Sequence, residues 1–333
     1  MTAAAVTRRS TALTPTHRSR VGRSSIAEVP DLAGDDGTVE DALAVAAEVF
    51  AGVRPRLFGI AYRLLGSWSE AEDVVQEAWL RWQNTDRSVV VSPAAFLATT
   101  TTRLALNVAQ SARARRETYI GPWLPEPVDT SADPTVGAER DQEVGLAVLL
   151  LLEKLTPTER AAYILRESFG YSYPEISDIV QVSQPAARQL VSRARKHLAG
   201  ERREQVPATT HRRFLEAFLR AAQTGDVVSL ERLLTDDVVS YSDGNGARQV
   251  SRHPVVGSQR VAAFVAAFQP RFWPGTQTQF VQANGREGVL ITADGAPLAL
   301  LTLEASSQGI HQLQWQLNPV KIAAFLRSTT RSL

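Results

Sequence analysis

Two helix-capping signals in close succession constrain this 333-residue chain more than any other feature. Thr156-Pro157-Thr158-Glu159 and Ser172-Tyr173-Pro174-Glu175 each place a hydroxyl residue three positions before a glutamate, with a proline in the first turn. The second signal predicts a short helix over 173–180. Gln181-Val182 then predicts a tight turn, and Ser183 caps a longer helix that follows. This spacing is typical of a helix–turn–helix, whose second helix enters the major groove of DNA.

The predicted second helix carries side chains that suit duplex DNA. Arginine binds guanine bidentately, glutamine binds adenine, and basic side chains contact phosphates. The alternative is a solvated basic helix in an ordinary helical hairpin. Gln181 departs from the motif, because glycine is common there and a left-handed turn costs another residue about 1 kcal/mol. The candidate DNA-contacting residues are Ser183, Gln184, Arg188, Gln189, Ser192, Arg193, Arg195 and Lys196.

Composition excludes several classes of protein. The chain has no cysteine, which rules out disulfides, a thiol nucleophile and cysteine-based zinc sites. Five histidines without metal-site spacing predict no metal, and we expect no cofactor. No apolar run reaches the roughly 18–20 residues of a membrane span, so we expect a cytoplasmic protein without membrane contact. The net charge of +1 is uninformative, but 103–116 and 184–200 are basic and lack acids.

The first third of the chain predicts a tail and a helical domain. Residues 1–38 lack hydrophobic periodicity and are expected to be disordered, and the first 27 could precede the true start codon. Residues 39–118 predict helices, of which one ends at Gly66. A capping box at Ser69 and Glu72 predicts the start of the next, and Ser92-Pro93 predicts the third.

The remainder predicts a linker and two further domains. Residues 119–140 are rich in proline and glycine, yet their first part is apolar enough to dock. Residues 141–205 contain the helix–turn–helix. From 206 to 333, helices precede four strand-like runs that end the chain, and HQLQWQLN alternates Leu and Trp with Gln. We therefore expect two all-α domains and a C-terminal α+β domain with a curved antiparallel sheet.

The second predicted helix has an unusual outer face. It combines acidic side chains with an exposed leucine, which suits a partner protein better than DNA. Taken alone, a solvated helix face is the commoner explanation. The residues concerned are Asp73, Gln76, Glu77 and Leu80.

Three stretches resemble one protein family over roughly residues 45–330. AYRLLGSWSEAEDVVQEAWLRW resembles region 2 of extracytoplasmic-function sigma factors. LTPTERAAYILRESFGYSYPEISDIVQVSQPAARQLVSRARKHL resembles their region 4. ARARRETYIGPWLPEP resembles the subgroup that carries a C-terminal SnoaL-like domain, a cone-shaped α+β barrel.

The resemblance implies promoter-specific initiation with core RNA polymerase, involving its β′ and β subunits. The acidic helix would bind a coiled coil of β′, and the helix–turn–helix would read the −35 element as duplex. The loop 84–95 would receive a flipped base of the −10 element, whose extrusion costs a few kcal/mol. The implied −10 contacts are Asn84, Arg87, Thr100, Arg103 and Asn107.

The resemblance also implies that the C-terminal domain regulates the sigma core in cis. Family motifs similar to DGGGK and NPDKL occur as Asp243–Ala247 and Asn318–Ile322, without the lysine of the first or the aspartate of the second. The implied interdomain residues are Trp123, Asp243, Asn245, Arg248, Asn318 and Lys321.

Enzymes also use this fold, with Asp or His as the base in an apolar pocket. The candidates are Asp243, His253 and His311, but no acid–base pair with a third group is evident, so we expect no catalysis. Whether the C-terminal domain binds a small-molecule ligand stays an open question at this point. Two further hypotheses are a ligand-sensing regulator that binds DNA alone and a SnoaL-type isomerase or cyclase with a DNA-binding passenger. The acidic face disfavours the stand-alone regulator, which does not need it.

Overall fold

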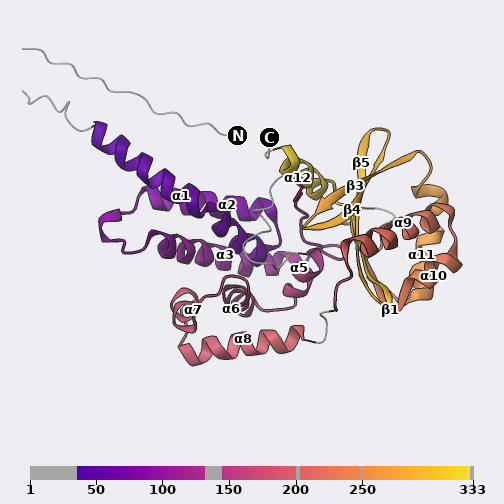
Figure 1. Ribbon diagram of the computed structural model, residues 1–333, viewed down its shortest axis with the longest axis horizontal. Coiled ribbons are helices and arrows are strands. Elements are labelled where there is room, and N and C mark those ends of the chain that lie inside the picture. The colour runs from indigo at the N-terminus through magenta and orange to yellow at the C-terminus, as the bar shows by residue number, and fades with distance from the viewer. Residues whose placement is uncertain (1–35, 132–144, 200–202, 248–249, 331–333) are drawn as a thin grey trace, which may run out of the picture. The chain divides into compact units, whose positions relative to one another are not determined.

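The computed structural model describes residues 36–131, 145–199, 203–247 and 250–330 (Figure 1). The chain divides into two units, Met1–Ala42 and Leu43–Leu333, and the contacts described below lie in the second. Within the described ranges, no helix has both the length and the apolar character that crossing a membrane requires.

The N-terminal helices are α1 (Asp36–Leu65), α2 (Trp68–Gln83), the short η1 (Arg87–Val89) and α3 (Pro93–Glu117). α1 starts slightly before the predicted boundary at 39. It ends, as predicted, at Gly66, whose φ of +63° is in the left-handed region. The predicted start of α3 is confirmed, because the Ala95 amide donates to Ser92 Oγ over 3.4 Å.

The predicted capping box at Ser69 and Glu72 is wrong. The cap of α2 is Ser67, whose Oγ accepts from the Glu70 amide over 3.2 Å. The Ser69 amide instead donates to the carboxylate of Glu126 in the linker, over 3.1 Å. Glu72 forms an ion pair with Arg54 over 2.6 Å. The helix can therefore begin earlier, since a distant carboxylate satisfies a second free amide of its first turn.

The helix–turn–helix segment comprises α5 (Leu146–Leu152), α6 (Pro157–Glu167), α7 (Tyr173–Val180) and α8 (Gln184–Leu198). Both predicted capping boxes are present, with Thr156 and Ser172 as the caps. Gln181 has a φ of +57°, so the left-handed turn is made without glycine. Ser183 caps α8 by accepting from the Ala186 amide.

The N-terminal helices and the helix–turn–helix segment share one hydrophobic core. Its buried side chains run from Ala46 on α1 to Leu198 on α8. α6 contacts α3 on one side and α8 on the other, and α3 also contacts α7. The two segments that were expected to be separate domains are therefore packed together in this structure.

The C-terminal domain contains a six-stranded sheet in the order β2-β1-β6-β5-β4-β3. Its elements are α9 (Ala208–Thr224), α10 (Val227–Leu233), β1 (Leu234–Asp243), β2 (Val255–Val256), α11 (Ser258–Phe272), β3 (Thr276–Ala283), β4 (Arg286–Ala293), β5 (Ala296–Ser306), β6 (Gly309–Gln316) and α12 (Pro319–Thr330).

The prediction of an antiparallel sheet is wrong at one pair, because β1 and β6 are parallel. The strands from β3 to β6 form successive antiparallel pairs, and β6 then returns beside β1 in the same direction. The α+β class is confirmed, with a mixed sheet.

Helices cover both faces of this sheet (Figure 1). On one face, Leu301 and Leu303 pack with α9 and α11 in the main core of the domain. On the other, Leu300 packs against Phe325 of α12. The prediction that strands end the domain is wrong, although Asn318-Pro319 is a helix-start signal. Gln314 and Gln316, on the second face, are consequently buried.

Candidate functional site

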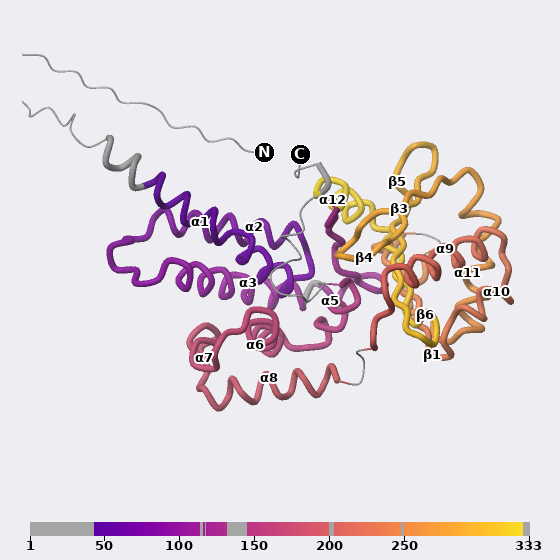
Figure 2. Tube along the Cα trace, in the orientation of Figure 1, coloured from indigo at the N-terminus to yellow at the C-terminus, as the bar shows by residue number. Residues whose placement is uncertain are grey.

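The described part of the linker, residues 119–131, lies between the N-terminal helices and the C-terminal domain. Figure 2 shows this stretch leaving the end of α3 and running beside α12 and the sheet. Its residues 124–128 are all buried. We call residues 119–130, together with the side chains that they contact on either side, the linker junction.

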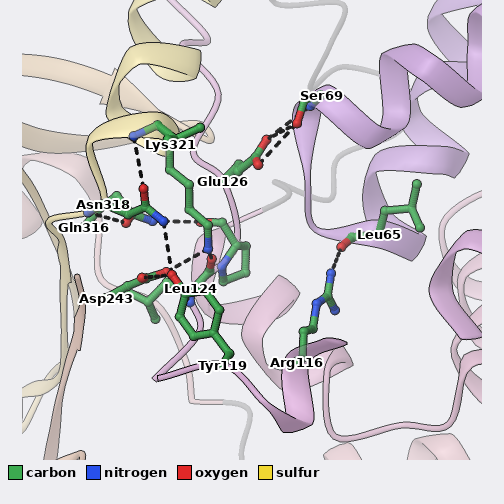
Figure 3. Close-up of polar contacts among 12 residues, drawn as sticks. Leu65, Ser69, Arg116, Tyr119, Leu124, Glu126, Asp243, Gln316, Asn318 and Lys321 are labelled. Atoms are coloured by element: carbon green, nitrogen blue, oxygen red, sulfur yellow. Dashed lines mark hydrogen bonds and ion pairs between the residues drawn. The ribbon is translucent and has the colours of Figure 1, made fainter. Parts of the chain in front are cut away.

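A buried carboxylate organises one half of the junction (Figure 3). Asp243 ends β1 and is fully buried, and its oxygens accept from the Tyr119 hydroxyl (2.5 Å), the Leu124 amide (2.9 Å) and Lys321 Nζ (2.7 Å). Lys321 Nζ also donates to the Leu124 carbonyl. Asn318 Nδ2 donates to the Tyr119 hydroxyl over 3.1 Å. The carboxylate is therefore paired and hydrogen-bonded, as a buried charge requires.

The electrostatics of this cluster follow from its burial. Burial lowers the pKa of Lys321, and the neighbouring Asp243 carboxylate opposes that shift. Burial raises the pKa of Tyr119, and its hydrogen bond to Asp243 adds to the effect. Tyr119 consequently stays a neutral hydrogen-bond donor to Asp243.

Trp123 connects the two sides of the junction through its ring. The guanidinium carbon of Arg116, on α3, lies 3.6 Å from the ring centroid, and Lys321 Nζ, on α12, lies 4.3 Å from it. The ring also approaches Gly66 so closely that a Cβ there would lie 2.9 Å from Trp123 Cη2. Gly66 therefore serves both the left-handed end of α1 and the docking of Trp123.

A second group of hydrogen bonds directly joins α1, the linker and the C-terminal domain. The Tyr62 hydroxyl, on α1, donates to the Glu126 carbonyl over 2.6 Å and accepts from Asn284 Nδ2 over 2.8 Å. Asn284 Oδ1 accepts from the Val128 amide, and the Asn284 amide donates to the Val128 carbonyl, both over 2.9 Å. Burial raises the pKa of Tyr62. Sequence reasoning missed this group of hydrogen bonds, since Asn284-Gly285 signals only a hairpin turn.

The structure brings four of the six predicted interdomain residues together: Trp123, Asp243, Asn318 and Lys321. Asn245 is exposed in the turn after β1, with a φ of +48°. Arg248 lies outside the described residues. In the same turn, Gly246 packs against the side chain of Ile120, which lies 3.3 Å from a Cβ built there.

The predicted polymerase-binding residues form one face of α2. Asp73 and Gln76 are exposed, and Leu80 is 46% exposed although it is apolar. Glu77 accepts from Arg81 Nε over 2.8 Å, one helical turn away. Trp82, on the opposite face, is buried and donates to the Ala46 carbonyl. The face is thus acidic and ends in an exposed apolar residue.

The predicted −10 residues lie at the end of α2, on η1 and on α3. Asn84 Nδ2 donates to the Leu80 carbonyl over 2.8 Å, and the Arg87 guanidinium carbon lies 5.9 Å from the Trp82 ring centroid. Thr100 is half-buried and Asn107 is exposed. Arg103 instead reaches the helix–turn–helix, where it donates to the carbonyls of Asp178 (2.8 Å) and Ile179 (3.1 Å).

All eight predicted −35 residues are exposed on α8 or at its cap. Arg195 forms an ion pair with Glu167 over 2.7 Å, and Arg193 lies 3.9 Å from Glu159. The Arg188 guanidinium carbon lies 5.4 Å from the Tyr173 ring centroid. The outer face of α8 is therefore basic, with its charges partly held by acids of α6.

The three catalytic candidates do not form one site. Asp243 belongs to the linker junction and pairs with Gln316 in the sheet, whereas His311 lies near the opposite end of β1. His253 is exposed. Burial lowers the pKa of His311 to about 4, with a further contribution from Arg203 that Asp237 opposes.

His311 makes the stability of the C-terminal domain sensitive to acid. The imidazole is neutral in the folded and unfolded chains above pH 6.5, its ordinary pKa. Between pH 6.5 and about 4 only the unfolded chain binds the proton, so stability falls as the pH is lowered through this window. We expect His311→Gln to flatten this dependence in melting temperatures measured from pH 7.5 to 4. An unchanged profile would assign the acid sensitivity to another group.

Comparison with known proteins agrees with this arrangement. Residues 49–116 match the family model for sigma-70 region 2, and residues 145–198 match the model for sigma-70 region 4. The chain is 37% identical over 246 residues to the ECF RNA polymerase sigma factor SigJ of Mycobacterium tuberculosis, covering 72% of this chain and 78% of that protein. The chain belongs to the extracytoplasmic-function sigma factors. It is a sigma factor for promoter-specific transcription.

One further relative and one solved structure extend the match beyond the sigma core. The probable ECF RNA polymerase sigma factor SigI of M. tuberculosis is 30% identical over 272 residues, with 80% of this chain and 91% of that protein covered. The crystal structure of M. tuberculosis SigJ superimposes with a TM-score of 0.68 at 33% identity, covering 83% of this chain and 98% of that one. The sigma factor thus carries a fused C-terminal SnoaL-like α+β domain.

Proposed function

We propose that this sigma factor docks on core RNA polymerase through α2, reads the −35 duplex with α8 and captures the −10 strand with α3 and the loop before it. We further propose that its C-terminal domain regulates these activities in cis. The linker junction is the observation that supports the regulatory part. Asp243 and Asn284 of the C-terminal domain bind the linker on one side, and Tyr62 and Arg116 of region 2 contact it on the other.

The face of α2 supports a polymerase contact. Asp73 and Glu77 precede the exposed Leu80 along one face of α2, so the face combines negative charge with an apolar anchor. Such a surface fits a basic partner that offers a hydrophobic pocket, since buried apolar anchors carry most of the binding energy and charges set orientation. A coiled coil of the β′ subunit is the partner we assign, and the β subunit would contact region 4.

The exposed face of α8 supports −35 recognition. Gln184, Arg188, Gln189 and Ser192 recur at helical spacing and present groups that bind base edges. Arg193 and Lys196 can bind phosphates. Arg195 can do the same once its ion pair with Glu167 is broken. Asn84, Arg87, Thr100, Arg103 and Asn107 are assigned to the −10 strand.

The structure describes a closed arrangement of regions 2 and 4. Because α6 contacts both α3 and α8, the two DNA-reading helices are only about 20 Å apart by ordinary helix packing. The −35 and −10 elements are about 25 base pairs apart, which is about 85 Å of duplex. Binding both elements therefore requires regions 2 and 4 to separate and Arg103 to leave the carbonyls of α7.

Docking of the linker opposes that separation. The whole segment from the end of α3 at Glu117 to the start of α5 at Leu146 could span about 95 Å if extended. With residues 119–130 held in the junction, the number of residues left allows a maximum reach of only about 50 Å. By holding residues 119–130, the C-terminal domain roughly halves the length of linker that can extend between regions 2 and 4. The shorter linker raises the effective concentration of region 4 near region 2 and so favours the closed state.

Run-off transcription with purified core polymerase on a promoter library tests the proposal. We compare the full-length protein, a chain truncated after residue 205 and Trp123→Ala at matched concentration. Both changes weaken docking of the linker, and Trp123→Ala loses two cation–π contacts of about 0.5–2 kcal/mol each. We expect both proteins to be several-fold more active than the full-length chain.

Val256→Ala is the control for that comparison, because Val256 is exposed on β2 of the same domain. It should leave transcription at the full-length level. Equal activity from the full-length, truncated and Trp123→Ala proteins would mean that the C-terminal domain is a passenger. Absence of promoter-dependent transcripts from all three would reject the sigma-factor assignment of these surfaces.

A further inference from the structure

Tyr173 occupies a rigid position at the edge of the DNA-reading surface. It is the first residue of α7, directly after the capping residue Ser172. The capping box fixes this turn, because the Ser172 amide donates to Glu175 Oε2 over 2.7 Å and the Glu175 amide donates back to Ser172 Oγ. The ring is half-buried and packs against the shared core, so one side is anchored and the other faces solvent.

Two arginines converge on this ring. The guanidinium carbon of Arg166 lies 4.8 Å from the centroid, and that of Arg188 lies 5.4 Å from it. Arg166 is held in place, since it also donates to the Tyr171 carbonyl over 2.8 Å. Arg188 is exposed on α8, and within the described chain the Tyr173 ring is the one contact found for its guanidinium.

This geometry restricts Arg188 before DNA is bound. A planar guanidinium reads guanine through two parallel hydrogen bonds to O6 and N7, which demands a defined orientation. Immobilising a long flexible side chain costs binding free energy, and a side chain that is already oriented avoids part of that cost. The ring attracts the guanidinium of Arg188 and so favours side-chain conformations that keep it beside Tyr173.

We propose that Tyr173 is a positioning residue for promoter selectivity, which holds Arg188 in the orientation that reads a guanine of the −35 element. The inference rests on the proposed role of Arg188 in −35 recognition. It goes beyond that role, because Tyr173 lies on the first helix of the motif and would affect base selectivity only by orienting Arg188. Phosphate binding by Arg188 would need no such orientation.

The test is selection on a promoter library randomised at the −35 element, using holoenzyme made with the full chain. The variants are Tyr173→Leu, Tyr173→Phe, Arg188→Ala and the double variant Tyr173→Leu/Arg188→Ala. Arg188→Ala identifies the base pair at which guanine preference is lost. At that pair we expect Tyr173→Leu to lower discrimination about three- to tenfold, and Tyr173→Phe to retain it because the ring remains. In the Arg188→Ala background, Tyr173→Leu should have no further effect on discrimination.

Tyr171→Leu is the matched control, because Tyr171 is a half-buried tyrosine two residues before Tyr173 whose ring contacts Arg56 instead (5.2 Å). It should leave the base preference unchanged. Melting temperatures of all variants show whether each is folded. If Tyr173→Leu lowers binding equally on every sequence, Tyr173 has a packing role only and the inference fails. If Arg188→Ala itself changes no base preference, the proposed −35 role of Arg188 fails, which is a different outcome.

Discussion

Changing both Asp73 and Glu77 to lysine will abolish binding of this sigma factor to core RNA polymerase while leaving its fold intact. The two carboxylates lie about two turns and one turn before Leu80 on the outer face of α2, and reversal replaces attraction to a basic partner with repulsion of several kcal/mol. The buried face of α2, with Val74, Val75 and Trp82, is untouched. Replacing the pair between Glu77 and Arg81 with two like charges costs the helix only about 0.4–1 kcal/mol, since the lost attraction and the new repulsion are each worth about 0.2–0.5 kcal/mol. Binding is measured by titrating labelled protein with purified core enzyme.

A charge-matched control separates a specific surface from a general effect of charge. Glu231→Lys with Asp236→Lys makes the same net change on the C-terminal domain, outside the linker junction. This protein should bind core polymerase like the unmodified chain. Unchanged affinity after the reversal on α2 would contradict the assignment of this face to the polymerase. Equal losses in both proteins would indicate an effect of net charge alone.

Replacing Lys321 with methionine will release the linker from the C-terminal domain. The change leaves the fully buried Asp243 without its counter-charge, and removing one partner of a buried pair costs about 3–5 kcal/mol. Undocking relieves this cost by exposing Asp243 to water, so the effect should appear as local opening rather than global unfolding. We expect much faster hydrogen exchange at the Leu124 amide, which donates a hydrogen bond to Asp243 in the docked state. We also expect higher promoter-dependent transcription.

Two further variants test that explanation. Arg327→Met removes an exposed cation from the same helix and should leave exchange and transcription unchanged. Asp243→Asn combined with Lys321→Met removes the buried charge altogether, so it should recover part of the docking lost in the single variant. Normal protection of the linker in Lys321→Met would show that the ion pair does not hold the junction.

The helix–turn–helix could be predicted in detail because its signals are local. A cap at Ser172, a turn at Gln181 and a second cap at Ser183 each depend on hydrogen bonds within a few residues. The apolar spacing of α7 and α8 indicates which face each helix buries. Even the left-handed turn followed from the spacing of the caps, although the residue there is not glycine.

The start of α2 shows where local signals stop being sufficient. Ser67 and Ser69 each lie three residues before a glutamate, so the sequence offers two equivalent capping boxes. The choice depends on Glu126, far along the chain, which accepts from the Ser69 amide in the folded protein. The linker junction has the same origin. Resemblance to the family indicated Asp243 and Lys321, but nothing near Tyr62 in the sequence indicates its bond to Asn284.

By itself, the sequence determined the order and type of most elements, the α+β class of the C-terminal domain and the exposed faces of α2 and α8, because periodicity and capping act over one or two helical turns. Only the tertiary structure decided that β6 runs parallel to β1, that the glutamines of β6 are buried, and that Arg103 binds α7. Those outcomes depend on packing between segments that are distant in the chain. The polar side chains involved can each contact water, DNA or protein, so the sequence alone does not determine which of these they contact.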